Sequence, residues 1–492
     1  MQCTAVGVIL FNVCSILISG MLFERRISYR IQLTEGCLNL YIFMMTKIKV
    51  PCPAGTVFEP AKWVVRKLRD AGFNCYWVGG AVRDLVLGRI PDDVDMVTDA
   101  VPEELKKVFP DAEMVGACFG VVLVKSSGVS FEVATCREER SYGDGRRPDE
   151  VKFTRDFVRD LQRRDFTVNA MLYDPEAGEV FDYCGGLRDI ELRLIRVVGN
   201  AEERFAEDYL RLFRAVRFAG KLNFELEDST QNALKKMAHL SSKLAAERVR
   251  EELEQMICSE NPARALRLLR DCGLLAVWLP EVAALDGVEQ HPVYHPEGDV
   301  WTHTLLMFER LQKRAEPLLA WSILLHDIGK KPTFSRDEDN IPHFYGHEAV
   351  GADMIRGIAQ RLRFSRELAE GVEHAVRYHM RFASVREMRQ AKLARLLAEK
   401  NFAVELELHR LDCLCSNGLM ETYAFLSEKS KKMSSLSLPP PLLNGNDLAT
   451  LGYKPGALFK KILNSVMDAQ LEDKLADKKS ALEFVKNNFP LG

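Results

Sequence analysis

The sequence predicts an α+β protein in which a small mixed sheet with helices, at residues 54–184, precedes a longer all-α region. Two observations predict this division. Up to residue 184, short apolar runs alternate with glycine-containing turns, as strands and hairpins do. After it, apolar residues recur at helical spacing. A chain of 492 residues also exceeds what one core holds, so three or four domains are expected.

The composition is that of an ordinary globular protein, with 47% hydrophobic and 28% charged residues. The net charge is −3, so any contact with nucleic acid must come from local basic patches rather than from the bulk charge. The 12 cysteines form no CxxC pair and have no regular spacing. We interpret them as reduced thiols of a cytoplasmic protein.

Residues 1–45 form an apolar N-terminal extension. Residues 5–23 are almost uncharged, and that length could just span a bilayer. A signal peptide would carry a basic start and a small-residue cleavage site, and neither is clear here. We favour an over-long reading frame, with translation starting at Met44 or Met45, over a membrane anchor, and we expect no stable membrane association. N-terminal sequencing of the native protein tests this hypothesis, and a start at Met1 would contradict it.

The turn at Gly79 and Gly80 is predicted to bind phosphate. Apolar positions recur at helical spacing over residues 56–71, so a helix precedes the apolar strand 75–78. The strand ends at the two glycines, and residues 81–87 are expected to be helical. Because Gly80 has no side chain, a ligand can approach its backbone, and free amides at a helix start suit a triphosphate.

Asp93 and Asp95 are the predicted catalytic pair. Residues two apart in a strand point to the same face, so the two carboxylates would project together. Such a pair can hold two divalent metals roughly 3.5–4 Å apart. The commoner interpretation of Asp-x-Asp is a solvated turn. A hairpin is predicted from residues 120–125 and 129–135, and its Glu132 is either a strand-face carboxylate or a third acidic group facing the pair.

The stretch from Gly79 to Asp95 has the spacing GGxVRDxxLGRxxxDxD. It resembles the tRNA nucleotidyltransferase and bacterial poly(A) polymerase family, class II of the polymerase-β-like nucleotidyltransferases. The resemblance covers the chain after the N-terminal extension. It implies a polymerase-β-like nucleotidyltransferase head, with Asp93 and Asp95 holding two Mg²⁺ and with Gly80 and Arg83 at the nucleotide.

The string RRDFTVNAM, residues 163–171, matches the second signature of this family. Arg164 would reach a phosphate through a forked pair of donors. Asp165 is expected to orient that arginine or to join the metal shell, with a structural salt bridge as the alternative. Residues 167–173 show an alternating pattern of side chains, as in a strand. Residues 139–151 resemble the flexible loop that lies beside the incoming nucleotide in the family.

A third block, EDYLRLFRAVRFA at residues 207–219, is predicted to be one helix. Its charged residues step by three along one face, which by itself is typical of a core helix with a salt-bridged outer stripe. The resemblance implies instead that Asp208 and Arg211 bind the Watson–Crick edge of ATP or CTP. UTP and GTP would be refused because they leave buried polar groups unpaired. Arg214 and Arg217 would support the phosphates or this amino-acid template.

Nine of the ten histidines lie between His291 and His409, and this concentration marks a site. An adjacent His-Asp pair on a helix offers two ligands of different hardness for one or two metals. The pattern resembles the HD phosphohydrolase superfamily. That resemblance implies four metal ligands: His303, His326, Asp327 and Asp412.

Five further residues of this region carry weaker expectations. His347 and His379 would complete a second metal site, and Lys330 would bind substrate phosphate. His374 and His409 are interpreted as satisfied or surface residues, which is the usual state of a lone helical histidine. The HD metal is a divalent cation whose identity stays open between Mg²⁺, Mn²⁺ and Ni²⁺.

The helical region is divided into three parts. Residues 185–290 are expected to form the neck and body, which carry the nucleotide template and contact the tRNA backbone through arginine-rich edges. Residues 291–426 form the HD domain. A linker rich in Ser, Lys and Pro covers residues 427–441, and a helical tail covers residues 436–492.

These observations predict an enzyme that adds C and A nucleotides from CTP and ATP to the 3′ end of tRNA, without a nucleic-acid template, by two-metal transfer with Mg²⁺. An HD phosphohydrolase activity is a further expectation. Three alternatives stay open: poly(A) or A-only addition to RNA 3′ ends, an HD phosphohydrolase whose head only senses nucleotide, and a non-catalytic tRNA-binding protein. The expected partners are tRNA, ATP and CTP, and the expected location is the cytoplasm.

Overall fold

The computed structural model describes residues 17–18, 21–22, 26–31, 42–115, 120–140, 150–434 and 439–490. The chain forms two compact units: residues 1–248 with 271–277, and residues 249–270 with 278–492. The boundary after Arg248 falls inside the segment that the sequence assigns to neck and body. Much of the extension 1–45 and of the loop 139–151 lies outside the described residues. None of the described helices combines the length and the apolar content needed to cross a membrane.

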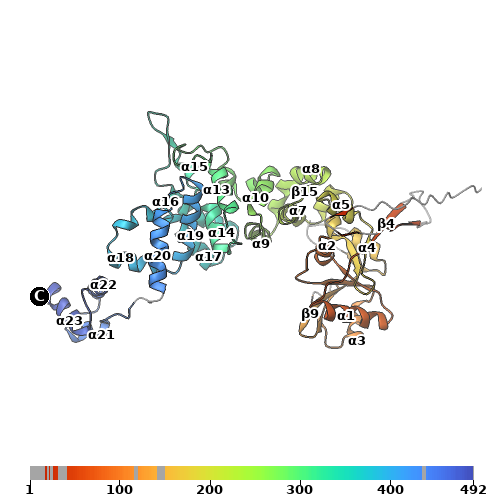
Figure 1. The fold of residues 1–492 in the computed structure, drawn as a ribbon, viewed down its shortest axis with the longest axis horizontal. Helices are drawn as coiled ribbons and strands as arrows, with labels where there is room; N and C mark the ends of the chain where they lie inside the picture. The colour runs from red at the N-terminus through yellow and green to blue at the C-terminus, as the bar shows by residue number, and fades with distance from the viewer. Residues whose placement is uncertain are drawn as a thin grey trace, which may run out of the picture. The chain divides into compact units, whose positions relative to one another are not determined.

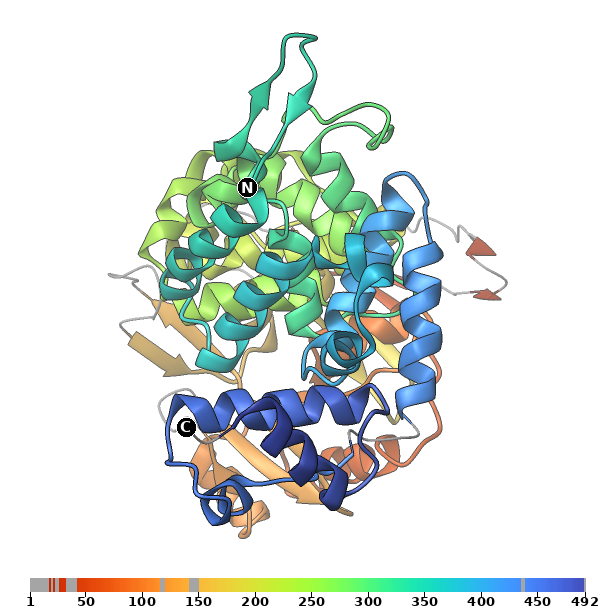
Figure 2. The ribbon, with the colours of Figure 1, turned by 90° about the vertical axis from the view of Figure 1, so that its left-hand side faces the viewer.

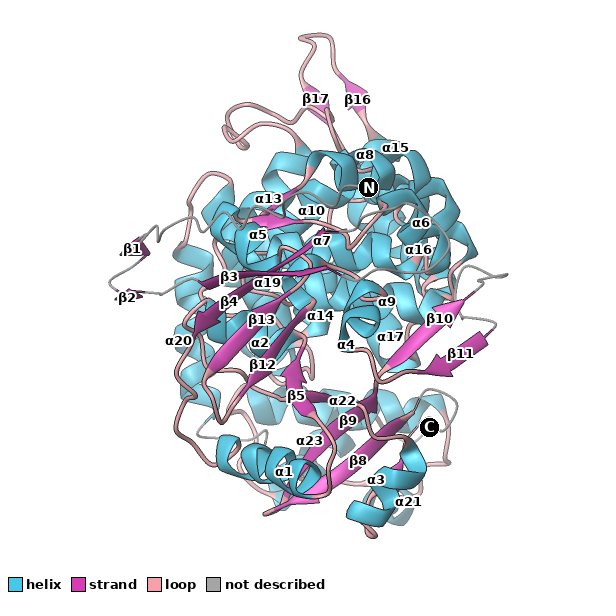
Figure 3. Ribbon diagram, turned by 90° about the vertical axis from the view of Figure 1, so that its right-hand side faces the viewer, coloured by secondary structure: helices cyan, strands magenta, loops and turns pink. Residues whose placement is uncertain are grey.

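Figure 1 shows the fold of the chain. The first unit is built on a nine-stranded sheet in the order β3-β4-β13-β12-β5-β6-β9-β8-β7, and most of these strands are labelled in Figure 3. Strand β5 (Cys75–Val78) pairs antiparallel with β6 (Asp95–Thr98), and β6 pairs parallel with β9 (Val129–Thr135). The other pairs are antiparallel, so the predicted mixed sheet is confirmed. The remaining strands are β3 (Arg26–Ile31), β4 (Ile42–Lys49), β7 (Glu113–Met114), β8 (Val121–Ser126), β12 (Met171–Asp174) and β13 (Glu179–Asp182).

The predicted helix and hairpin that flank strands β5 and β6 are both present. Helix α1 (Phe58–Asp70) packs against β5 and β8 through a face of buried apolar residues. Strands β8 and β9 are joined through Ser127 and Gly128, which both have positive φ, as a tight hairpin turn requires. The other helices of the head are α2 (Gly80–Val86), α3 (Pro102–Val108), α4 (Phe157–Gln162) and α5 (Gly186–Leu192), and the outlying strand pairs are β1 (Leu17–Ile18) with β2 (Met21–Leu22) and β10 (Arg137–Arg140) with β11 (Glu150–Phe153).

Residues 167–169 form the 3₁₀ turn η2 (Thr167–Asn169), so the prediction of a strand over 167–173 is wrong in its first half. The Thr167 hydroxyl donates to Asp189 Oδ2 at 2.6 Å, and the Thr167 amide donates to the Arg196 carbonyl. These bonds tie η2 to Asp189 of α5 and to the backbone of Arg196. The strand β12 therefore begins only at Met171.

The segment after the head is mostly helical but carries one short parallel strand pair, β14 (Leu194–Ile195) with β15 (Glu225–Leu226). The prediction that everything after residue 184 is helical is therefore wrong at this point. The helices of this segment are α6 (Ala201–Glu207), α7 (Leu210–Leu222), α8 (Asp228–Met237) and α9 (Ala246–Ile257), with the 3₁₀ turn η3 (Ala238–Lys243). Helix α9 crosses from the first unit into the second.

Among its described residues, the second unit has helices and one hairpin, β16 (Ser335–Arg336) with β17 (Pro342–His343), which projects from the helices in Figure 2. The helix α20 runs to Ser434, so the predicted linker begins later than residue 427. The helix α11 (Leu274–Trp278) lies in the first unit except for its last residue. The other helices of the second unit before the tail are α10 (Pro262–Asp271), α12 (Pro280–Ala283), α13 (Val300–Glu309), α14 (Pro317–Leu325), α15 (Lys330–Thr333), α16 (His347–Arg361), α17 (Arg366–Tyr378), α18 (Gln390–Leu397), α19 (Phe402–Cys415) and α20 (Glu421–Ser434), with the 3₁₀ turn η4 (Arg381–Glu387).

The tail is helical as predicted, with α21 (Gly445–Thr450), α22 (Ala457–Leu471) and α23 (Lys478–Asn488). Leu448, Ile462 and Val485 are fully buried in a core of its own. The cysteines among the described residues are all free, as expected for reduced thiols.

Candidate functional site

Asp95 is the first residue of β6 and lies opposite Val78, the last residue of β5. Asp93 precedes the strand, so the prediction that both aspartates lie within it is only half right. The pairing of Met96 with Val133 places Glu132 of the neighbouring β9 beside Asp95, on the same face of the sheet. A third carboxylate thus lies next to the predicted pair.

Two of these carboxylates act on the third, Asp95. Burial and, after it, the nearby charges of Asp93 and Glu132 together raise the pKa of Asp95 to about 6, against the opposing effect of Arg164. Carboxylates that lie close together repel each other unless a cation lies among them. Carboxylate oxygens suit a divalent metal, but among the described residues these three are not one of the groups whose ligand atoms all lie within 4.8 Å of one another. A metal between them, and the role of Glu132 as a third acidic group, therefore stay predictions.

The backbone turn at Gly79 lies beside Asp95. Gly79 has φ +76° and ψ −138°, a conformation that other residues rarely adopt. A Cβ built on it would lie 3.6 Å from Asp95 Oδ2 and 4.0 Å from Arg164 Nη1. The glycine turn, the carboxylate and the arginine are therefore in one place, as the phosphate-binding prediction requires.

Replacing Gly79 by Ala should lower the stability of the head by about 1–3 kcal/mol, because alanine is strained in this conformation. The added methyl group would also press on Asp95 and Arg164, so nucleotide affinity should fall. Gly72→Ala is the matched control, because Gly72 has φ +87° but open space around it. Urea unfolding and nucleotide titration measure the two effects; unchanged nucleotide affinity in Gly79→Ala would contradict the assignment of this turn.

Arg164 is oriented by a buried carboxylate, Asp160 of α4. Its Nε and Nη2 donate to Asp160 Oδ2 at 3.2 and 3.0 Å, which leaves Nη1 on the side of Gly79. Burial alone would raise the pKa of Asp160, but the guanidinium groups of Arg164 and Arg163 hold it below its ordinary value. Asp160 is a residue that the sequence reasoning missed.

Asp165 does not orient Arg164, and that prediction is wrong. Its Oδ2 accepts from Arg214 Nε at 3.0 Å and from Arg214 Nη2 at 2.5 Å, while its Oδ1 accepts from the Phe166 amide. Asp165 therefore forms a structural salt bridge, which was the alternative prediction, and its partner is Arg214 of α7. Burial opposes the charge of Asp165, but Arg214 lowers its pKa.

Three arginines of the predicted nucleotide site make cation–π contacts with the same aromatic ring. The guanidinium carbons of Arg83, Arg214 and Arg217 lie 5.5, 5.4 and 4.4 Å from the centre of the Phe218 ring. Arg83 is buried, and it also donates to Asn169 and to Asp84. Direct contact between nucleotide and these arginines stays a prediction. Phe218 stands in the string that the sequence analysis quoted, but its role was missed.

The predicted helix over 207–219 is interrupted at its start. Asp208 is extended, with φ −145° and ψ 106°, and its Oδ1 accepts from the Leu210 amide, so α7 begins only at Leu210. Its Oδ2 lies 3.4 Å from Arg248 Nη2. Arg211 instead donates to Glu207 Oε2 at 2.5 Å. The predicted template residues are thus near each other in sequence but have different partners here.

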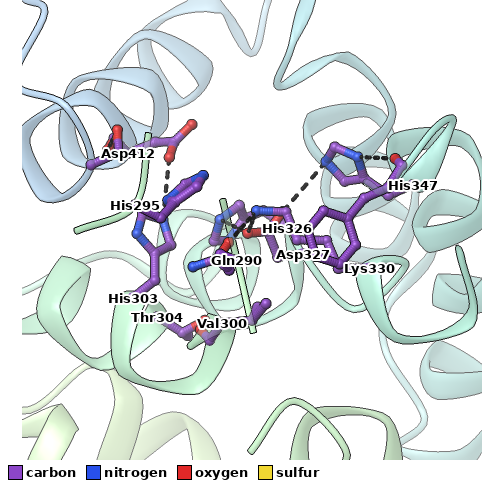
Figure 4. A network of polar contacts seen from close by, with 12 residues as sticks. Gln290, His295, Val300, His303, Thr304, His326, Asp327, Lys330, His347 and Asp412 are labelled. Atoms are coloured by element: carbon purple, nitrogen blue, oxygen red, sulfur yellow. Dashed lines mark hydrogen bonds and ion pairs between the residues drawn. The ribbon is translucent and has the colours of Figure 1, made fainter. Parts of the chain in front are cut away.

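A second group of candidate residues converges in the HD region, and Figure 4 labels all of them except His379. His303 comes from α13, and Asp412 comes from α19. His326 and Asp327 follow α14. The potential ligand atoms form two clusters in which all atoms lie within 4.8 Å of one another: His303, His326 and Asp412, and Asp327, His347 and His379.

The imidazole rings are oriented as metal ligands require. Nδ1 of His326, His347 and His379 each bonds the carbonyl three residues earlier, at 2.9, 2.9 and 2.7 Å. Each Nε2 is therefore the atom that points into the centre. The Nε2 atoms of His347 and His379 lie 3.1 Å apart, and the buried Nε2 of His326 makes no hydrogen bond. Burial lowers the pKa of His379 to about 4, which keeps that ring neutral.

Asp327 is the residue that joins the two clusters. Its Oδ1 lies 3.5 Å from His347 Nε2, while its Oδ2 lies 3.1 Å from His326 Nε2. Lys330 Nζ lies 2.7 Å from the same Oδ2 and donates to Gln290 at 2.7 Å. Burial opposes ionisation of Asp327, but His326 and Lys330 hold its pKa well below the ordinary value. A cation between such donors fits this set, and phosphate binding by Lys330 stays a prediction.

His374 and His409 lie outside this centre, as expected. His374 Nδ1 lies 2.6 Å from Glu405 Oε1, and Arg381 also pairs with Glu405 and Glu399. This arginine already balances the two carboxylates, so we assign no metal to them. The His409 ring packs 5.2 Å from that of Phe382.

Three family models match the chain. They are described as the Poly A polymerase head domain, at residues 75–196, the probable RNA and SrmB-binding site of polymerase A, at residues 223–285, and the HD domain, at residues 299–401. The first covers the carboxylates and Arg164. The third covers most of the histidine centre but ends before Asp412.

Curated relatives and solved structures extend the match. The CCA-adding enzyme of Geobacillus kaustophilus is 46% identical over 227 residues, which are 46% of this chain and 56% of that protein. The chain thus spans little more than half the length of that relative. The CCA-adding enzyme of Bacillus licheniformis is 33% identical over 428 residues, which are 87% of this chain and 97% of that protein. The crystal structure of the Bacillus stearothermophilus CCA-adding enzyme in complex with CTP has a TM-score of 0.67 at 26% identity and covers 88% of this chain and 98% of its own.

Proposed function

Because the chain belongs to the family of CCA-adding enzymes, we propose that it adds C and A nucleotides from CTP and ATP to the 3′ end of tRNA in the cytoplasm. The observation that carries this proposal is the group of three carboxylates beside the Gly79 turn and Arg164. The name of a relative that aligns over nearly its whole length supports the activity. The likeness to a structure solved with CTP supports the substrate class.

The proposed reaction is attack by the tRNA 3′-hydroxyl on the α-phosphorus of the nucleoside triphosphate, with release of pyrophosphate. Asp93 and Asp95 would hold Mg²⁺, with Glu132 beside them. When bound, Mg²⁺ lowers the pKa of the attacking hydroxyl and neutralises charge on the leaving phosphates. Arg164, held by Asp160, donates to a phosphate oxygen near Asp95. The backbone of Gly80 at the start of α2 offers amide donors to the triphosphate.

Base selection is assigned to Asp208 and Arg211. Cytosine and adenine both present an amino donor next to a ring-nitrogen acceptor, which a carboxylate and a guanidinium match. In the structure these groups bind Arg248 and Glu207, so a nucleotide would have to replace those partners. A base with the opposite donor pattern would not replace the hydrogen bonds that Asp208 and Arg211 lose when they release these partners. This unfavourable exchange is the physical reason why UTP and GTP would be refused.

The assay that tests the proposal gives the purified full chain a tRNA that lacks its CCA end, together with each nucleoside triphosphate in turn. We expect incorporation of C from CTP and then of A from ATP, with little use of UTP or GTP. Equal use of all four nucleotides, or none, would defeat the proposal. Addition of A without prior C would favour poly(A) or A-only addition instead.

The HD region supports a second activity, the hydrolysis of phosphate esters. The observation that favours it is the pair of clusters joined by Asp327, where the Nε2 atoms and carboxylates converge. A bound divalent cation would activate water and polarise a phosphate. The family resemblance points to 2′,3′-cyclic or phosphomonoester RNA ends as substrates. Release of inorganic phosphate from such ends by the full chain, lost after chelation and restored by Mn²⁺ or Ni²⁺, would be the expected result.

A further inference from the structure

Glu297 is a buried carboxylate at the edge of the histidine centre that none of the motifs includes. It lies between α12 and α13, and its side chain is 7% exposed. One of its oxygens, Oε1, lies 2.6 Å from Nδ1 of His303 and 2.9 Å from Nδ1 of His295. A single carboxylate oxygen thus binds two imidazole rings.

The bond to His303 determines which nitrogen of that ring faces the centre. Because Nδ1 carries the hydrogen that Glu297 accepts, Nε2 is left toward Asp412, whose Oδ1 lies 3.2 Å away (Figure 4). His303 is fully buried, so no water competes for its nitrogens. A carboxylate behind a ligating histidine orients the ring and raises its basicity, and losing such a partner typically costs about 10- to 100-fold in metal affinity.

The segment that carries Glu297 is held against the centre at a second place. Gln290 accepts from Lys330 Nζ at 2.7 Å, and Lys330 in turn pairs with Asp327. Within the segment, the Gly287 amide donates to Asp299 Oδ2 at 2.6 Å, and the Val300 amide donates to the Val288 carbonyl. Residues 287–300 therefore form a bonded loop that contacts His303 of the first cluster directly and Asp327 of the second cluster only through Lys330.

We propose that Glu297 is a positioning residue of the HD metal centre, which holds His303 through Nδ1 so that Nε2 can ligate a divalent cation. The other three histidines of the centre obtain the same orientation from backbone carbonyls. His303 is the one histidine of the two clusters whose Nδ1 depends on a side chain. This inference rests on the proposed metal centre and adds a residue that supports its first cluster.

The test measures Mn²⁺ binding to the chelator-treated full chain by titration calorimetry. All variants carry Asp93→Ala and Asp95→Asn, so that the head contributes no metal binding. Glu297→Leu should weaken Mn²⁺ binding about 10- to 100-fold. Glu297→Gln keeps an oxygen that accepts from Nδ1 and should recover most of that loss. Glu289→Gln is the control on the same loop, because Glu289 is exposed and pairs with Arg336, and it should bind Mn²⁺ like the parent.

The outcomes separate the inference from the function on which it rests. No Mn²⁺ binding by the parent with Glu297 intact would defeat the metal centre itself. Normal binding by the parent and equal binding by Glu297→Leu would defeat only the role of Glu297. A Glu297→Gln variant as weak as Glu297→Leu would show that the oxygen acceptor is not what matters, and would also overturn the inference. Thermal unfolding of each metal-free variant shows whether Glu297→Leu is folded, and Glu297→Gln keeps the test decisive if it is not.

Discussion

Replacing Asp95 by Asn should reduce nucleotide addition to tRNA by at least about 10³-fold. Metal ions supply several kcal/mol of transition-state stabilisation, and about 4 kcal/mol corresponds to a factor of 10³ in rate. An amide binds Mg²⁺ more weakly than a carboxylate because it lacks the negative charge. The measurement is kcat for CTP incorporation into tRNA that lacks its CCA end.

Two controls separate this loss from unfolding. Asp95 has a raised pKa because of burial and its neighbours Asp93 and Glu132, so removing its charge relieves repulsion in the metal-free protein. Asp95→Asn should therefore be no less stable than the parent when metal is absent. Asp92→Asn, an exposed carboxylate in the same segment, should keep addition within about 2-fold, as surface substitutions usually do. More than a tenth of the parental rate in Asp95→Asn would refute the assignment.

Replacing His326 by Gln should remove phosphate-ester hydrolysis, again by about 10³-fold or more, because the first metal cluster loses a ligand. His326 is a better test than Asp327. Asp327 also neutralises the buried Lys330, and breaking a buried ion pair typically costs about 3–5 kcal/mol of stability. Loss of activity in an Asp327 variant would therefore be hard to separate from unfolding.

Nucleotide addition by His326→Gln should stay within about 2-fold of the parent, because His326 lies in the second unit and the carboxylates of the head lie in the first. The converse is expected of Asp95→Asn, which should retain hydrolysis. His374→Gln is the matched histidine control, since His374 pairs with Glu405 outside the two clusters. If His326→Gln hydrolyses phosphate esters and binds Mn²⁺ like the parent, the proposed HD centre is wrong.

Local geometry explains which site residues the sequence could predict. Gly79, Gly80 and Asp95 follow one another across a strand, a turn and a second strand, so the spacing alone implies that they meet. The histidine centre was also predictable, because an adjacent His-Asp pair and a clustering of histidines are visible in the string. The resemblance to known families placed His303 and Asp412 in the same centre.

Side-chain partners were much harder to predict. Asp165 pairs with Arg214, which is 49 residues away, and not with the adjacent Arg164. Asp208 lies before the start of α7 instead of on its face, and its carboxylate accepts from the Leu210 amide. Several acceptors compete for each of these arginines, and the local sequence does not show which one is nearest after folding.

The sequence by itself determined the α+β class, because that class depends on periodicity and on short-range spacing. It also predicted the turn at Gly79 from its spacing and, through the family resemblance, most of the candidate ligands. Only the tertiary structure placed Glu132 beside Asp95, gathered three arginines over Phe218 and brought Glu297 to His303. The physical reason is that strand order and helix packing are set by burial summed over the whole core. The partner of a carboxylate can be predicted from the sequence only when that partner is a near neighbour along the chain.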